Sequence, residues 1–240
     1  MSLLSVSGLT KRFGGITANR DISFDVAPGE LVGIIGPNGS GKSTLFEVIS
    51  GFYRPDAGEV RLDGCRLTGL PPDRVCRLGV ARTFQKLRPF AGLTVVDNVM
   101  VGALTRTRDV RHARTRARDL LDRVGLAEKA DAHARTLSTG QRKRLELARA
   151  LATEPQVLLL DEVTGGVDQR SIPGLVQLVR DLHRSGLTLL VIEHNMRVIT
   201  AVAQRILALY LGEKIADGPP DAVTRDQRVV EAYLGQAYVQ

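Results

Sequence analysis

Two groups of residues have the types and the spacing for chemistry on a phosphate. The first is the run Gly36-Pro-Asn-Gly-Ser-Gly-Lys-Ser-Thr44, which fits G-x-x-x-x-G-K-[ST] between an apolar run, Leu31–Ile35, and a helix start at Leu45–Ile49. Its glycines let successive backbone N–H groups point at one anion, and the start of the helix adds partial positive charge. The loop therefore predicts a nucleotide site.

Every residue of this loop is a candidate for contact with the nucleotide: Gly36, Pro37, Asn38, Gly39, Ser40, Gly41, Lys42, Ser43 and Thr44. Lys42 can reach the β- and γ-phosphates, and the Ser43 hydroxyl suits Mg²⁺. The alternative is a glycine-rich turn with an incidental lysine. The strand–loop–helix context argues against that alternative.

The second group is the carboxylate pair Asp161 and Glu162, which ends the all-apolar run Val157–Leu160. Ligands of open α/β sheets bind at the carboxyl ends of strands, so this pair and the phosphate loop can converge. Asp161 then suits the Mg²⁺ shell, and Glu162 can accept a hydrogen bond from a water that attacks the γ-phosphate. The alternative is an ordinary acidic strand end.

Three further features are weaker when they are judged from the residues alone. His194 follows the apolar run Leu187–Ile192 and could reach the same region, although a lone histidine is more often structural. Gln85 has a neutral amide that can contact a metal or a water. Ser138-Thr-Gly-Gln141 looks like a capped helix start, which would form a second phosphate site for a partner's nucleotide.

The elements that must position these residues indicate an α/β fold. Short strands are expected at Leu3–Ser7, Ile22–Val26, Leu31–Ile35, Glu59–Leu62 and Val80–Thr83. The segment 95–151 lacks proline and carries apolar residues at helical spacing, so it predicts a helical subdomain inserted into the core.

Strand and helix patterns alternate again after Pro155. The expected order is strand Val157–Leu160, helix Ile172–His183, strand Leu187–Ile192, helix Met196–Ala203, strand Ile206–Leu211, a turn with an edge strand at Gly212–Asp217, and an amphipathic helix around Val229–Leu234.

Composition bounds the class of protein. The chain has 240 residues, a net charge of +7 and two cysteines without metal-ligand spacing, and no apolar run approaches the roughly 18 residues of a membrane span. No signal peptide is evident, so we expect a cytoplasmic protein with reduced thiols. Six arginines between Arg106 and Arg118 could bind anionic lipid or nucleic acid, but no aromatics are interleaved, which favours a solvated helix face.

Together these residues resemble the ATP-binding cassette (ABC) ATPases over essentially the whole chain. The matching motifs are the phosphate loop Gly36–Thr44, the glutamine switch Gln85, the signature Leu137–Gln141, the magnesium-site strand Val157–Glu162, the loop Gly166–Asp168, the switch histidine His194 and the adenine-facing aromatic Phe13. The resemblance implies a P-loop NTPase core with an N-terminal antiparallel β region, formed by 1–94 and 152–240, and a helical signature subdomain at 95–151.

The resemblance also implies roles for these residues and the cofactors ATP and Mg²⁺. Glu162, His194 and Gln85 would be catalytic, and Ser43, Gln85 and Asp161 would hold the metal. A head-to-tail pair of cassettes would sandwich ATP, with one group of residues placed against the partner's nucleotide or the dimer interface: Leu137, Ser138, Thr139, Gly140, Gln141 and Asp168. A groove near Gln85, with Phe84 and Phe90, would grip a helix of a separate permease.

Within the family, several stretches are similar to the ATPase subunits of branched-chain amino acid importers. They are Ala81–Gln85, Leu93–Asn98, Val191–Met196 and Glu231–Gly235. This similarity implies a subunit on the inner face of the membrane, a second ATPase that is a paralogue or an identical chain, and a solute-binding protein. Lipopolysaccharide export and uptake of urea or short amides are alternatives. Soluble cassettes that act on nucleic acid or ribosomes usually carry two cassettes or a long coiled coil, which this chain lacks, so no nucleic acid is expected.

Three positions depart from the family pattern. Thr139 replaces a glycine of the signature, Val163 replaces the proline after the catalytic glutamate, and Gln169 replaces the proline after Asp168. None removes a group that binds phosphate, metal or water, so hydrolysis is expected to survive. Val163 and Gln169 are expected to loosen the loop at the dimer interface.

Overall fold

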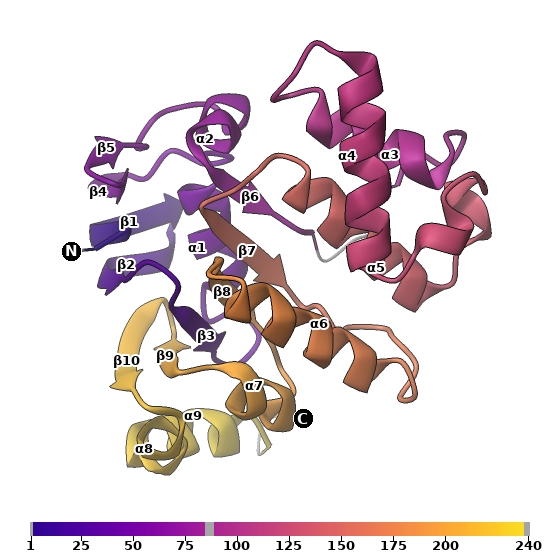
Figure 1. Ribbon diagram of the computed structural model, residues 1–240. Helices are drawn as coiled ribbons and strands as arrows, with labels where there is room; N and C mark the ends of the chain where they lie inside the picture. Colours follow the sequence, from indigo (N-terminus) through magenta and orange to yellow (C-terminus); the bar gives the residue numbers. More distant parts are fainter. Residues whose placement is uncertain (1, 85–88, 238–240) are drawn as a thin grey trace.

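Residues 2–84 and 89–237 are described by the structure, which is a computed structural model. This part of the chain forms two sheets with a group of helices to one side (Figure 1). The N-terminal sheet is antiparallel, with the strand order β2-β1-β4-β5. Its strands are β1 (Leu4–Phe13), β2 (Ile16–Val26), β4 (Ala57–Leu62) and β5 (Cys65–Arg66).

The second sheet carries the candidate site, with the strand order β10-β9-β3-β8-β7-β6. It is parallel except for the antiparallel edge strand β10. Its strands are β3 (Leu31–Ile35), β6 (Val80–Arg82), β7 (Val157–Asp161), β8 (Thr188–Ile192), β9 (Arg205–Tyr210) and β10 (Glu213–Gly218). Because β3, β8 and β7 are neighbours, the loops that follow them lie at one edge of the sheet.

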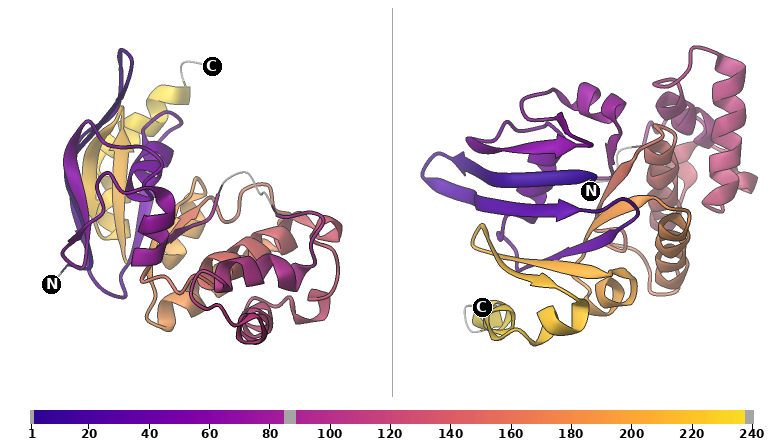
Figure 2. Two further views of the ribbon diagram at one scale, coloured as in Figure 1. Left: turned by 90° about the horizontal axis from the view of Figure 1, so that it is seen from above. Right: turned by 60° about the vertical axis from the view of Figure 1, so that its left-hand side comes forward.

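Side chains of the parallel sheet alternate between two cores, since successive residues of a strand point to opposite faces. Val32 and Ile34 of β3 face a core that includes the N-terminal sheet and helix α1 (Lys42–Ile49). Leu31 and Ile35 face the other core, which includes the helical segment. Figure 2 shows α1 between the two sheets. The phosphate loop is therefore fixed from both of its ends.

The segment 95–151 is helical, as its composition predicts. It contains α3 (Val95–Ala103), α4 (Val110–Arg123), the 3₁₀ turns η1 (Ala127–Lys129) and η2 (Ala134–Thr136), and α5 (Thr139–Leu151). On α4 the buried residues Ala113, Ala117, Leu120 and Leu121 repeat at helical spacing. This stripe packs α4 against α3 and α5.

The remaining described helices cover the parallel sheet or connect its strands. They are α2 (Pro72–Leu78), α6 (Ile172–Arg184), α7 (Met196–Val202), α8 (Pro220–Arg225) and α9 (Gln227–Ala237). Neither α2 nor α8 was expected from apolar periodicity, because both are short. Each begins with proline in its first turn, a start signal that could have revealed it. No described helix is both long and apolar enough to cross a bilayer.

The first two strands are longer than the apolar pattern predicts. Leu3–Ser7 and Ile22–Val26 cover only about half of β1 and β2, which continue to a turn at Gly14-Gly15. Register shifts after Val6 break the period of two, so the distal half does not read as a strand.

The arginine-rich stretch forms a solvated face whose charges are partly paired. Arg114 and Arg118 on α4 lie beside Asp131. Arg116 lies 3.9 Å from Glu154. Arg106 lies before the helix and donates to the backbone carbonyl of Thr153 at 2.6 Å.

Candidate functional site

The phosphate loop adopts backbone geometry that requires glycine. Gly36 has φ 152° and Gly41 has φ 98°, and α1 begins at the next residue. A Cβ atom at Gly36 would lie 2.2 Å from the carbonyl oxygen of Leu209, and one at Gly41 would lie 2.2 Å from that of Ala18. The loop is thus packed between β9 and β2 and cannot accept larger residues there.

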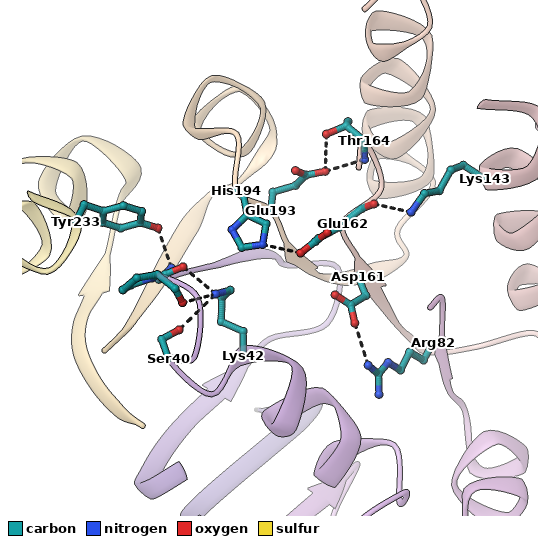
Figure 3. A network of polar contacts seen from close by, with 12 residues as sticks. Ser40, Lys42, Arg82, Lys143, Asp161, Glu162, Thr164, Glu193, His194 and Tyr233 are labelled. Carbon is teal, nitrogen blue, oxygen red and sulfur yellow. Dashed lines mark hydrogen bonds and ion pairs between the residues drawn. The ribbon is translucent and has the colours of Figure 1, made fainter. Parts of the chain in front are cut away.

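Lys42 lies inside this loop and is 5% exposed. Its Nζ donates to the carbonyl oxygens of Gly36 at 2.7 Å and Pro37 at 2.9 Å (Figure 3). Burial lowers the pKa of the ammonium, while the carboxylates of Glu162 and Asp161 act to raise it. The Lys42 ammonium therefore lies inside the phosphate loop. Phosphate oxygens of a bound nucleotide would take the place of the two carbonyl oxygens as its hydrogen-bond acceptors.

Asp161 has one carboxylate oxygen in use and one without a partner. Its Oδ2 accepts from Arg82 at 2.9 Å, and both side chains are buried. Its Oδ1 is buried and has no hydrogen-bond partner among the described residues. Such an oxygen is costly unless it is satisfied, and carboxylate oxygens suit Mg²⁺. Ser43 lines the same cavity as Asp161.

Glu162 is held in a strained backbone conformation next to His194. Its φ is 51°, a region that costs about 1–3 kcal/mol for a residue other than glycine. Nε2 of His194 lies 2.5 Å from its Oε1, and its carbonyl accepts from Nζ of Lys143 at 2.7 Å. Its N–H donates to the carbonyl of Ile192 at 3.0 Å. Lys143 and Ile192 therefore hold the backbone of Glu162, and His194 contacts its carboxylate (Figure 3).

The residues after Glu162 are anchored by a buried carboxylate. Oε1 of Glu193 accepts from the backbone N–H of Thr164 at 2.8 Å and from its hydroxyl at 2.9 Å. Val163 is 5% exposed and packs in the core. The loosening expected from Val163 and Gln169 stays a prediction.

The signature segment begins α5 with a capping box, as predicted for Ser138. Oγ of Ser138 accepts from the N–H of Gln141, and Oε1 of Gln141 accepts from the N–H of Ser138 at 3.0 Å. A Cβ atom at Gly140 would lie 3.4 Å from Ser171, whose hydroxyl donates to Asp168 at 2.7 Å. The signature thus lies beside the Asp168 loop.

These two segments do not join the phosphate loop of their own chain. Among the described residues, no recorded hydrogen bond or ion pair links Leu137–Gln141 or Asp168 with Gly36–Thr44. Gln85 is outside the described residues. The structure therefore brings together Lys42, Ser43, Asp161, Glu162 and His194, and leaves the signature elsewhere.

Phe13 lies on the hairpin that contacts the phosphate loop. Its side chain is 42% exposed, and its ring meets that of Tyr53 edge to face with centroids 5.1 Å apart. Nζ of Lys11 lies 5.3 Å from the Phe13 ring. An exposed aromatic at this place can stack on a nucleotide base.

The sequence model described as ABC transporter matches residues 19–165, more than half of the chain. The chain belongs to the ABC transporter family. The ATPases of this family hydrolyse ATP as transporter subunits, and this cassette is such a nucleotide-binding subunit. A second model, described as branched-chain amino acid ATP-binding cassette transporter, matches residues 213–239.

Known relatives and solved structures agree with this assignment. The high-affinity branched-chain amino acid transport ATP-binding protein LivG of Escherichia coli is 38% identical over 98% of both chains. The lipopolysaccharide export system ATP-binding protein LptB of Escherichia coli is 35% identical over 99% of both. An ABC transporter cassette in its ADP conformation is 31% identical, with a TM-score of 0.88 over 98% of this chain and 99% of its own. A dimeric bacterial ABC transporter cassette is 29% identical, with a TM-score of 0.82 over 90% and 98%.

The cavity that Ser43 and Asp161 line has a volume of about 760 Å³ and extends between α1, α2 and β6 on one side and the helical segment on the other. Phe52 and Phe84 line it and meet edge to face with centroids 5.7 Å apart. Phe90, the other predicted groove residue, has its ring 4.7 Å from the guanidinium of Arg149, which lines the cavity. The cavity is lined by both apolar and charged side chains.

Glu146 lines this cavity, and its burial predicts that the stability of the cassette depends on pH. Burial raises the pKa of Glu146 to about 7 from an ordinary 4.5. Its Oε1 accepts from the N–H of Phe84 at 2.8 Å, and its Oε2 has no hydrogen-bond partner among the described residues. Between these pH values the folded state holds more protons than the unfolded state, so stability falls as pH rises through this range.

In a Glu146→Gln variant, stability is expected not to fall as pH rises through this range, because the glutamine amide is neutral. Its carbonyl oxygen can still accept the hydrogen bond from the N–H of Phe84. The free energy of unfolding of the variant minus that of wild type should increase by on the order of 2 kcal/mol from pH 5 to pH 8. Urea unfolding at both pH values measures this change. The exposed Glu128→Gln variant is the control, and an equal difference at both pH values contradicts the prediction.

Sequence reasoning missed four residues of the site. Arg82 lies within Ala81–Gln85, Lys143 follows the signature Leu137–Gln141, and Tyr53 follows the helix start Leu45–Ile49. Lys143 precedes the buried Leu147 by one helical turn and so falls on the apolar face of α5, a signal that could have revealed it. Tyr233 lies within Glu231–Gly235, but nothing in that stretch indicates a contact with the phosphate loop.

Proposed function

We propose that the cassette powers uptake of branched-chain amino acids, or of related small polar solutes, through a separate permease. The observation that carries this proposal is the match of residues 213–239 to the branched-chain amino acid cassette model. It agrees with the full-length similarity to LivG.

A bound nucleotide also contacts the chain whose phosphate loop holds it. We assign these contacts to residues that meet at the ends of β3, β7 and β8. Lys42 binds the β- and γ-phosphates, and Glu162, oriented by His194, accepts a hydrogen bond from the attacking water. Ser43, Asp161 and Gln85 would hold Mg²⁺, which neutralises charge on the phosphate oxygens when it is bound. The unpartnered Oδ1 of Asp161 supports this assignment.

We further propose that the cassette works in a head-to-tail pair. Ser138, Gly140 and Asp168 serve the dimer interface and the partner's nucleotide, a role supported by the capped start of α5 at Ser138 and by the position of the signature beside the Asp168 loop. The dimeric cassette structure supports such a pair. We expect the second cassette to be a paralogue or an identical chain.

The cavity beside Phe52 and Phe84 is the proposed docking site for a helix of the permease. Its apolar lining residues suit a packed helix, and the Oε2 atom of Glu146, which has no hydrogen-bond partner among the described residues, suits a basic or hydrogen-bond-donating side chain. A solute-binding protein would act through that permease. Nucleic acid is not an expected partner, since several arginines of the basic stretch already face acids.

Lipopolysaccharide export is the second candidate, and the full-length similarity to LptB favours it over a role on nucleic acid or ribosomes. One experiment separates import from export. The tagged cassette is purified from detergent-extracted membranes, its partners are identified by mass spectrometry, and the complex is reconstituted for uptake of labelled leucine. We expect a permease pair and leucine-stimulated ATPase activity.

An export complex with a β-rich component, and no stimulation by leucine, would replace import by the second candidate. Stimulation of the ATPase activity by urea or a short amide, and not by leucine, would support an importer whose solute is urea or a short amide. Recovery of RNA in place of a permease would contradict both candidates.

A further inference from the structure

The C-terminal helix α9 contacts the first residue of the phosphate loop. The backbone N–H of Gly36 donates to the hydroxyl oxygen of Tyr233 at 2.8 Å (Figure 3). The carbonyl of the same glycine accepts from Nζ of Lys42 at 2.7 Å. Gly36 is therefore held on one side by α9 and on the other by the loop's own lysine.

The contact is made between parts that have little freedom to move. Val229 and Ala232 of α9 are buried, and Tyr233 packs against the core that includes β9. Burial raises the pKa of the Tyr233 hydroxyl, so the group is neutral at physiological pH. Gly36 is confined by Leu209 and Ser40, which leave no room for a Cβ atom.

We propose that Tyr233 is a positioning residue for nucleotide binding, which makes α9 part of the ATP site. The proposal rests on the assignment of Gly36–Thr44 as the phosphate loop. Amides that must bind a phosphate together bind it more tightly when their geometry is already fixed. The Tyr233 hydroxyl fixes the peptide group where β3 becomes the loop, and so lowers the cost of ordering the amides that follow.

A Tyr233→Phe variant tests this role, because it removes one oxygen and keeps the ring in the core. The N–H of Gly36 then loses its partner, and the affinity for ADP should fall by about three- to tenfold. The KM for ATP should rise by the same factor, while kcat at saturating ATP stays within about twofold. Calorimetry with ADP and steady-state hydrolysis measure these changes.

Tyr210→Phe is the matched control, since Tyr210 ends β9, the strand next to β3. It should leave both KM and ADP affinity at wild-type values. Hydrogen exchange of the peptide that spans residues 31–45 adds a direct readout. We expect faster exchange there in Tyr233→Phe without nucleotide, and wild-type exchange in Tyr210→Phe.

A Lys42→Ala variant tests the assignment of the phosphate loop independently of the positioning role of Tyr233. If Lys42→Ala weakens ADP binding and Tyr233→Phe does not, the positioning role is wrong and the phosphate loop stands. If neither variant changes affinity, the phosphate-loop assignment fails as well. A lower melting temperature of Tyr233→Phe with unchanged ADP affinity would show a structural role only, and would overturn the proposal.

Discussion

A Glu162→Gln variant is expected to bind ATP as wild type does and to hydrolyse it about 10²- to 10⁴-fold more slowly. The amide cannot take a proton from the attacking water, and its shape matches the carboxylate. The backbone contacts of residue 162 persist, because Lys143 bonds its carbonyl and Ile192 bonds its N–H. The loss is therefore chemical and not structural.

The consequence for assembly is an ATP-bound dimer that no longer comes apart. Light scattering with ATP and Mg²⁺ should show a stable dimer of the variant, whereas wild type returns to monomer as ATP is consumed. Glu128→Gln, on the surface, should behave as wild type in both assays. Rapid hydrolysis by Glu162→Gln would refute the role of this carboxylate.

A Lys42→Ala variant is expected to bind ATP about 10- to 100-fold more weakly. It loses charge-assisted hydrogen bonds from an ammonium to phosphate oxygens, which are stronger than neutral ones. Calorimetry with ATP in the absence of Mg²⁺ measures the change without hydrolysis. The exposed Lys129→Ala is the control, and unchanged affinity of Lys42→Ala would contradict the loop assignment.

The stability of Lys42→Ala without nucleotide gives an independent check. Lys42→Ala removes a charge whose burial is unfavourable but also loses the hydrogen bonds from Nζ to Gly36 and Pro37, so the melting temperature without nucleotide should change little. The increase in melting temperature that ATP gives to wild type should be lost in the variant, because ligand stabilisation follows affinity. A defective fold would instead lower the melting temperature without nucleotide.

The residues that meet at the ends of β3, β7 and β8 were predictable because local rules identify each of them. Gly36–Thr44 has a fixed motif, and Asp161 and Glu162 follow an apolar strand whose end must lie at the ligand edge. The contact between His194 and Glu162 follows from the pairing of β8 with β7, whereas the sequence indicated only that His194 could reach this region.

Contacts made across long sequence distances were not predictable from local patterns. Tyr233 is an ordinary residue of an amphipathic helix, and nothing near it in sequence indicates that its hydroxyl reaches Gly36. The partner of Arg82 depends on the pairing of β6 with β7. The distal halves of β1 and β2 escaped prediction because bulges interrupt their alternation.

The strand order of the parallel sheet also determines when the ATP site can form during synthesis. In this sheet β3 pairs only with β8 and β9, with Leu31 beside Leu189 and Val32 beside Arg205. At about 5–20 residues per second, a ribosome needs on the order of ten seconds to add those strands after β3. The phosphate loop is thus synthesised early. The strands β8 and β9, which flank β3, are added only when most of the cassette has been translated. Nucleotide binding is therefore among the last properties that the growing chain acquires.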